Sequence, residues 1–320
     1  MKIFITGCAG FIGANFTKYW LEKYPHDQIV GVDVLTYAAN LPALKILQNA
    51  PNFTFYRENI CNATKMQEIF QAEKPDVVVH FAAESHVDRS IENGGVFMQT
   101  NALGTQILLD CALRFPVKRF HQISTDEVYG DLPLDSKEAF KETSLLNPSS
   151  PYSASKAAAD LMALAYYKTH ALPVSISRST NNFGKYQHPE KLIPKAVLYA
   201  LKKQEFPLYG NGLNVRDWLF VDDHSRAIER ILLQGKAGEI YNVGANNLRT
   251  NIQIVEKIYA LLGAEKSLIR FVEDRKGHDR KYALDCSKLE NELGIKAQAD
   301  FEKALENTVF WLANEFSKQV

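Results

Sequence analysis

Seven residues near the N-terminus decide the fold: Gly7-Cys8-Ala9-Gly10-Phe11-Ile12-Gly13. They follow the β-branched and aromatic run Lys2 to Thr6 and precede apolar residues at helical spacing. Glycines at these positions let a strand turn sharply into a helix and let the backbone approach a pyrophosphate. Asp33 follows roughly 20 positions later, where its carboxylate would accept hydrogen bonds from a ribose diol and repel a 2′-phosphate. The stretch therefore predicts a dinucleotide site that prefers NAD to NADP, the alternative being a turn with only a structural role.

Cys8 stands inside this turn and has two possible interpretations. A helix N-terminus could stabilise its thiolate, or the turn could simply accommodate a small side chain. No basic residue is adjacent in sequence, which favours the second interpretation.

Strands alternate with helices through the first half of the chain. Besides Lys2 to Thr6, strands are expected over 28–32, 53–57, 76–82, 119–124, 173–178 and 239–243, and helices over 64–72, 100–115 and 152–169. Such alternation is typical of parallel βαβ units, and continuously apolar strands indicate helices on both faces of the sheet. We predict an α/β fold, a doubly wound parallel (Rossmann) sheet with a second, smaller substrate-binding lobe.

The pattern changes beyond Asn181, where prolines and glycines break the chain into shorter pieces. We expect a Rossmann domain over 1–180 plus about 217–244 that binds NAD. The smaller domain is expected over about 181–216 plus 245–320.

Composition excludes several classes of protein. In 320 residues, 46% are hydrophobic, and 37 Lys and Arg balance 37 Asp and Glu. The chain therefore lacks the net charge that would gather nucleic acid or an anionic membrane. The four cysteines have no metal or redox spacing, and no apolar run is long enough for a signal peptide or a membrane span. We expect a cytoplasmic protein that has no metal and binds neither nucleic acid nor membranes.

Two further groups carry chemistry. Tyr152 and Lys156 are four residues apart on an expected helix, so they share a face, and an ammonium beside a phenol stabilises the phenolate. Thr125, Asp126 and Glu127 follow an expected strand at the sheet edge where open α/β folds bind ligands. If their environments separate the two pKa values, one carboxyl serves as an acid and the other as a base. A surface pair and a solvated loop are the structural alternatives.

Together these residues resemble the extended short-chain dehydrogenase/reductase superfamily over essentially the whole chain. The Thr125-Asp126-Glu127 triplet with Tyr152 and Lys156 is similar to the nucleotide-sugar 4,6-dehydratases, in particular those acting on dTDP-glucose. Five further stretches agree: Ala82–Ser90, Asn181–Gly184, Pro189–Pro194, Asn214–Trp218 and Gly277–Arg280.

The resemblance implies a hydro-lyase that uses NAD and regenerates it in each turnover. Tyr152, tuned by Lys156, would take the O4 proton during oxidation at C4, with Thr125 aligning O4. Glu127 would remove the C5 proton, and Asp126 would protonate O6 as it leaves as water. Hydride would then return to C6.

The resemblance also implies binding residues. Cofactor contacts are expected from Gly7, Gly10, Phe11, Ile12, Gly13, Asp33, Asn59, Ile60, Ala82, Tyr152 and Lys156. Nucleotide-sugar contacts are expected from Ser85, Asn181, Lys191, Leu192, Tyr209, Arg216, Asn251, Arg275 and His278, in keeping with the smaller domain as the nucleotide-sugar-binding one. Two positions depart from the family pattern: Asn59 replaces an aspartate expected to contact the adenine, and Cys8 replaces a glycine.

Several alternatives remain open. The substrate could be UDP-glucose, because one methyl group, worth about 0.8 kcal/mol, separates thymine from uracil. GDP-mannose is another alternative. A nucleotide-sugar 4-epimerase would need Tyr152 and Lys156 but not the pair Asp126 and Glu127. A non-catalytic NAD-binding protein is the alternative from another class. Apolar faces on the helices expected over 100–115 and 153–169 further predict a homodimer through a four-helix bundle.

Overall fold

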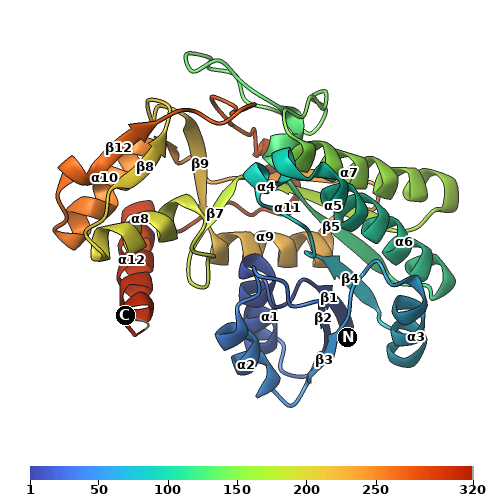
Figure 1. Cartoon of the computed structure of the whole chain (residues 1–320). Coiled ribbons are helices and arrows are strands. Elements are labelled where there is room, and N and C mark those ends of the chain that lie inside the picture. The colour runs from blue at the N-terminus through green and yellow to red at the C-terminus, as the bar shows by residue number, and fades with distance from the viewer. Residues whose placement is uncertain (319–320) are drawn as a thin grey trace.

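A parallel β-sheet forms the centre of the larger lobe (Figure 1). The computed structural model describes residues 1–318, and within them seven strands have the order β10-β6-β5-β4-β1-β2-β3. Each neighbouring pair is parallel. The strands are β1 (Lys2–Thr6), β2 (Gln28–Asp33), β3 (Phe53–Arg57), β4 (Val77–His80), β5 (Arg119–Thr125), β6 (Val174–Ser179) and β10 (Ile240–Val243). The predicted α/β fold with a doubly wound parallel sheet is confirmed.

Helices cover both faces of this sheet because successive strand residues point to opposite sides. In β1, Phe4 packs in a core with Leu108, whereas Ile3 packs in a second core with Phe16 and Ile228. The long helices of the larger lobe are α1 (Phe11–Lys23), α3 (Ala63–Glu73), α6 (Gly104–Arg114), α7 (Pro151–His170) and α9 (Val221–Gln234). The shorter ones are α2 (Leu41–Gln48), α4 (Val87–Glu92), α5 (Gly94–Phe97) and α11 (Ser287–Leu293).

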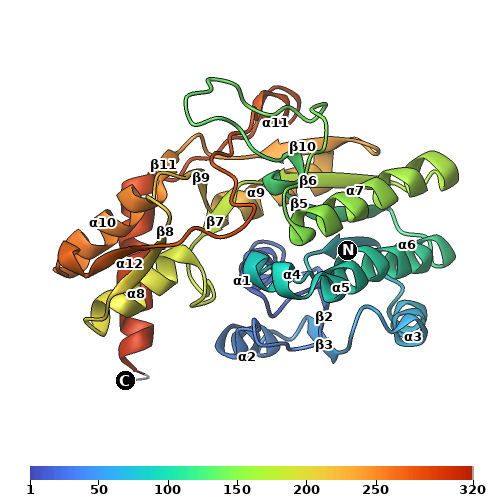
Figure 2. The same cartoon turned by 45° about the horizontal axis from the view of Figure 1, so that its top comes forward.

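The smaller lobe is assembled from segments that leave the large sheet and return to it (Figure 2). Its strands are β7 (Asn181–Phe183), β8 (Phe206–Tyr209), β9 (Val215–Phe220), β11 (Leu248–Thr250) and β12 (Ile269–Val272). They form two small sheets, β11-β9-β7 and β12-β8. Its helices are α8 (Leu192–Leu201), α10 (Asn251–Leu262) and α12 (Phe301–Ser317), with a short 3₁₀ turn over Lys266–Leu268. One apolar core, which includes Trp218, Ile258 and Leu305, holds these elements together.

The helix expected over 100–115 differs from the prediction. The chain is already helical in α5, continues as a π-helix over Met98–Leu103 and becomes α6 only at Gly104. Asn101 lies in the π segment, and its Nδ2 donates to the Glu84 carbonyl at 3.0 Å and to Ser155 Oγ at 2.8 Å. These hydrogen bonds to two other segments stabilise the π-helix, which is rare because it is less favourable than an α-helix.

Other boundaries lie within a few residues of those expected. Helix α7 begins at Pro151 because the Ser150 and Ser153 side chains form a reciprocal capping box. Strand β4 ends at His80, earlier than expected, and the Ala82 amide donates to Thr6 Oγ1 at 3.2 Å instead of continuing the ladder. Through residues 1–318, no helix is both long and apolar enough to span a membrane.

Two buried histidines are held neutral inside the large sheet. His80 contacts the hydroxyls of Thr6 at 2.6 Å and Thr105 at 3.0 Å, and His121 contacts those of Ser175 at 2.9 Å and Ser177 at 3.1 Å. Burial lowers the pKa of each to about 3.

The buried histidines predict acid sensitivity. An unfolded histidine binds a proton below about pH 6.5, but His121 in the folded chain does not until about pH 3, so its contribution to stability is present above pH 6.5 and lost as pH falls. By pH 5 the loss is about 2 kcal/mol per histidine. Urea unfolding at pH 7.5 and pH 5 should therefore show a smaller pH-dependent loss in His121→Gln than in the parent. Equal losses in both proteins would contradict the prediction.

Candidate active site

A cavity of about 470 Å³ opens at the carboxyl edge of the large sheet. Strand ends, the glycine turn, α7 and the start of the smaller lobe contribute to its wall. It brings together 17 of the residues singled out in the sequence: Gly7, Gly10, Phe11, Ile12, Gly13, Asp33, Asn59, Ile60, Ala82, Ser85, Thr125, Asp126, Glu127, Tyr152, Lys156, Asn181 and Lys191. Segments far apart in the chain therefore meet at one cavity.

The glycine turn has no room for larger side chains at two positions. Gly7 has φ +69°, and a Cβ there would lie 2.6 Å from the Ala82 nitrogen. A Cβ on Gly13 would lie 2.2 Å from the Gly7 carbonyl oxygen. Gly10, in contrast, borders the cavity, and a Cβ there would meet only the Gly7 oxygen, at 3.3 Å. The bare backbone at the start of α1 thus offers the cradle that a pyrophosphate needs.

Asp33 lies at the end of β2 beside this turn. Its carboxylate accepts hydrogen bonds from the Ala9 amide at 3.0 Å and the Leu35 amide at 2.8 Å. Burial raises its pKa, and the two amides oppose that shift. The donor set and the open cradle fit a dinucleotide.

Cys8 is fully buried beneath the turn, where its Sγ would lie 2.7 Å from a Cβ on Gly31. Burial raises the pKa of its thiol well above the ordinary value. The thiolate interpretation of Cys8 is therefore wrong, because the side chain fills a gap in the core.

Tyr152 and Lys156 are buried on the same face of α7. Lys156 Nζ donates to the Ile123 carbonyl at 2.6 Å, which ties α7 to the end of β5. Burial lowers the pKa of Lys156 to about 8, and the Asp160 carboxylate opposes this fall. Burial, with Glu127 nearby, raises the pKa of Tyr152. The pair consequently consists of a phenol and an amine on one face of α7, and the amine changes its protonation state near pH 8.

The two carboxyls after β5 have different surroundings. The Thr125 hydroxyl accepts from the Glu127 amide at 3.3 Å and donates to Asp126 Oδ1 at 3.2 Å, so a 3₁₀ turn over Asp126–Tyr129 starts here. Asp126 is 2% exposed, and burial together with Glu127 raises its pKa well above the ordinary range. Its Oδ2 has no hydrogen-bond partner within residues 1–318.

Glu127 is partly buried, and burial raises its pKa as well, but three cations, Arg275, Arg216 and Lys191, oppose the shift. One carboxyl is thus favoured as a proton donor and its neighbour as a base, the division that acid–base chemistry at a single site requires.

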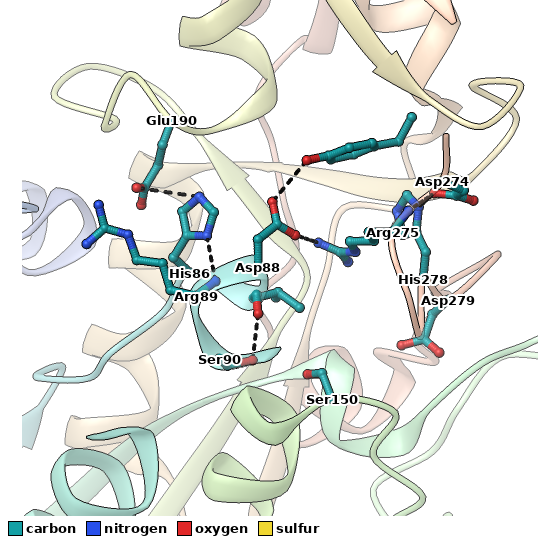
Figure 3. Close-up of polar contacts among 12 residues, drawn as sticks. His86, Asp88, Arg89, Ser90, Ser150, Glu190, Asp274, Arg275, His278 and Asp279 are labelled. Atoms are coloured by element: carbon teal, nitrogen blue, oxygen red, sulfur yellow. Dashed lines mark hydrogen bonds and ion pairs between the residues drawn. The ribbon is translucent and has the colours of Figure 1, made fainter. Parts of the chain in front are cut away.

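The cations belong to the smaller lobe and its connecting loops. Lys191 Nζ donates to the Ser85 carbonyl at 2.9 Å. Arg275 pairs with the Asp88 carboxylate of α4 (Figure 3), and the two side chains are 3.6 Å apart. Arg216 donates to the Asp279 carbonyl at 2.8 Å. All three act electrostatically on Glu127, and Lys191 lines the cavity, so positive charge of the kind that a diphosphate would need lies on this side of Glu127.

Six of the expected substrate residues do not line the cavity: Leu192, Tyr209, Arg216, Asn251, Arg275 and His278. They lie in or near the smaller lobe, at the starts of helices, at the ends of strands or in the loop after β12. Tyr209 donates to Asp88 at 3.3 Å, which places it beside Arg275. His278 contacts Asp274 at 2.6 Å, and burial lowers its pKa to about 4, so it is neutral near pH 7.

Sequence reasoning missed other polar groups around the cavity. Glu190 contacts His86, as Figure 3 shows, at a distance of 3.5 Å. It also lies 3.6 Å from His188 and lines the wall of the cavity. Asp160 lies one turn after Lys156 on α7 and forms a buried ion pair with Arg178 at 2.9 Å. The helical spacing of 152, 156 and 160 was a signal for Asp160. Glu190 stands inside a stretch that the resemblance covered but had no spacing signal of its own.

Comparison with known proteins agrees with this geometry. The family model described as GDP-mannose 4,6 dehydratase matches residues 4–308. A dTDP-glucose 4,6-dehydratase from Haemophilus influenzae is 45% identical, with 97% of each chain covered. The crystal structure of a dTDP-glucose 4,6-dehydratase from Streptomyces venezuelae, which holds NAD, has a TM-score of 0.95 at 44% identity and covers 99% of this chain and 98% of that one.

The fold is shared more widely than the chemistry. A UDP-glucose 4-epimerase from Thermotoga maritima has a TM-score of 0.91 at 27% identity, with 99% of this chain and 100% of that one covered. Sequence identity over the full length separates the two groups. The chain belongs to the dTDP-glucose 4,6-dehydratase family.

Proposed function

We propose that this chain dehydrates dTDP-glucose to dTDP-4-keto-6-deoxyglucose. The observation that carries the proposal is the carboxyl pair beside Tyr152, buried Asp126 and partly buried Glu127, in a cavity that begins at the glycine turn. The dTDP-glucose 4,6-dehydratase from Haemophilus influenzae, which is 45% identical to this chain, supports the proposal. NAD supplies the hydride acceptor at C4 and the hydride donor at C6.

In the proposed reaction Tyr152 takes the proton from O4. The Lys156 ammonium and the positive nicotinamide offset the burial that raises the phenol's pKa. The Thr125 hydroxyl, at the end of β5, aligns O4. With a ketone at C4, the C5 proton becomes acidic.

The carboxyl pair carries the elimination. Glu127, held toward its ionised form by the surrounding cations, accepts the C5 proton. Asp126, whose buried environment favours the protonated form, gives its proton to O6, which leaves as water. Proton removal and donation thus come from adjacent residues.

The binding roles follow the two lobes. The proposed cofactor domain is 1–180 plus about 217–244, with the glycine turn, Asp33, Asn59, Ile60 and Ala82 as contacts. The proposed nucleotide-sugar domain is about 181–216 plus 245–320. Its contacts, with Ser85 from the first domain, are Asn181, Lys191, Leu192, Tyr209, Arg216, Asn251, Arg275 and His278. The three cations that face Glu127 support a diphosphate on that side.

We also propose a cytoplasmic homodimer. Support comes from exposed apolar side chains beside α6 and on α7: Leu103 is 48% exposed and Leu161 57%. The two helices lie side by side in both overall views (Figures 1 and 2). A second copy would bury these side chains in a four-helix bundle.

A substrate panel tests the proposal. Purified protein is incubated with dTDP-glucose, UDP-glucose and GDP-mannose, and mass spectrometry follows the loss of one water. We expect loss from dTDP-glucose. Dehydration of only another sugar nucleotide would keep the chemistry and replace the substrate, whereas unchanged mass with C4 inversion would favour a 4-epimerase.

Replacing the proposed base should stop the elimination. In Glu127→Gln we expect dehydration of dTDP-glucose to fall at least about 100-fold, because general base catalysis contributes roughly that much. Folding should be retained, since the amide is isosteric. The exposed Glu138→Gln is the matched control and should keep parental activity. Parental turnover in Glu127→Gln would exclude Glu127 as the base.

The dimer is tested by light scattering on size-exclusion eluates. The parent should have a mass of twice the 36.1 kDa of the chain. Leu161→Glu should run as a monomer, because a charge would be buried at the interface. Phe310→Glu, at a 48% exposed position on α12, is the control that should stay dimeric. A monomeric parent at micromolar concentration would overturn the proposal.

A further inference from the structure

One face of α7 carries a third ionisable side chain beyond the tyrosine and the lysine. Asp160 follows Lys156 by one helical turn and is 0% exposed. Its Oδ2 accepts hydrogen bonds from Ser124 Oγ at 2.9 Å and from Arg178 Nε at 2.9 Å. Its Oδ1 is buried and has no hydrogen-bond partner within residues 1–318. One oxygen of this carboxylate is therefore hydrogen-bonded and paired with Arg178, while the other has no hydrogen-bond partner among residues 1–318.

Consecutive residues of β5 connect the same groups. The Ile123 carbonyl accepts from Lys156 at 2.6 Å, and the Ser124 hydroxyl donates to Asp160. Thr125, the next residue, lines the cavity beside Tyr152. A shift of α7 along β5 would break the first two bonds and move the phenol away from Thr125. Asp160 thus helps fix the geometry as well as the charge.

Charged and titratable side chains from β4, β6 and the 3₁₀ turn lie around Asp160 and Lys156. Arg178 on β6 pairs with Asp160, and its guanidinium lies 4.8 Å from the ring centre of Tyr129 on the 3₁₀ turn. His80 on β4 is close enough to Lys156 to sense its charge and is itself neutral near pH 7. Asp160 is accordingly the anion that faces Lys156 from its own helix.

We propose that Asp160 is a positioning residue for the dehydration: anchored by Ser124 and Arg178, it keeps Lys156 as an ammonium against the Ile123 carbonyl. The ammonium then stabilises the Tyr152 phenolate. The inference rests on the proposed function and deepens it by assigning a residue that does not touch the substrate.

The sign of the pH effect follows from the charges. Burial lowers the pKa of Lys156 to about 8, and Asp160 raises it from where burial alone would leave it. An ammonium needed for activity is present below that pKa and is lost as pH rises through it. Neutralising Asp160 lowers the pKa further, so the alkaline limb of kcat moves to lower pH. Asp160 also raises the pKa of Tyr152, so its removal moves the acid limb in the same direction.

The test compares kcat against pH in Asp160→Asn and in the double variant Asp160→Asn with Arg178→Met. The double variant guards against unfolding, because removing one partner of a buried ion pair is costly and removing both is often tolerated. We expect the alkaline limb to move down by about one pH unit and kcat at pH 8 to fall about fivefold, with KM for dTDP-glucose nearly unchanged. The single variant Arg178→Lys, which keeps both charges of the ion pair, should have the alkaline limb of the parent.

A second readout does not depend on turnover. Acetic anhydride acylates only neutral amines, so competitive labelling followed by peptide mass spectrometry titrates Lys156 directly. We expect half-labelling of Lys156 at a pH about one unit lower in the double variant than in the parent. Glu229→Gln is the matched control, since Glu229 is a mostly buried carboxylate that pairs with Lys23 on α1, away from the cavity.

The outcomes separate the two proposals. A folded double variant with the parental labelling curve, or a uniform fall in kcat without movement of the limb, would overturn the role of Asp160. A parent that dehydrates none of the sugar nucleotides would refute the proposed function, while a shifted labelling curve would still support the effect of Asp160 on Lys156.

Discussion

The hydrogen bond from Lys156 Nζ to the Ile123 carbonyl joins the helix that carries the phenol to the strand that carries the carboxyl pair. The helix and the strand are far apart in sequence, and neither of them carries all the side chains of the site. Because the lysine is buried, this bond must also compensate for water that the ammonium has lost. The depth of the cavity, the depressed pKa of Lys156 and the raised pKa values of the neighbouring acids all follow from the same burial.

Burial does not act equally on the two carboxyls. Among residues 1–318, one oxygen of the buried Asp126 has no hydrogen-bond partner, whereas Glu127 is influenced by cations from the smaller lobe and its connecting loops. Burial therefore favours the protonated form of Asp126, and the cations of the smaller lobe oppose the same shift at Glu127. Both pKa values are raised, and more of the surrounding cations oppose the rise at Glu127 than at Asp126.

The features that are local in sequence could be predicted. The glycine turn, the strands of the large sheet and the pair on α7 depend on backbone sterics and on apolar spacing over a few residues. The π-helix could not be predicted, because it depends on Asn101 reaching Glu84 and Ser155. The burial of Cys8 against Gly31 and the pairing of Arg275 with Asp88 likewise depend on contacts between distant segments. The roles of the site residues stay predictions until they are tested by substitution.

The way in which the chain passes between the lobes has a mechanical consequence. It leaves the large sheet after β6, returns from β9 into α9, and leaves again after β10. Because several crossings join the two lobes, a hinge motion between them would need backbone changes in every crossing at once. A bulky, doubly charged ligand would therefore enter and leave by displacement of loops beside the cavity, such as the one after β12 that carries Arg275. The distance between the two lobes would change little. The rate of product release would then depend on the motion of those loops rather than on a motion of one lobe against the other.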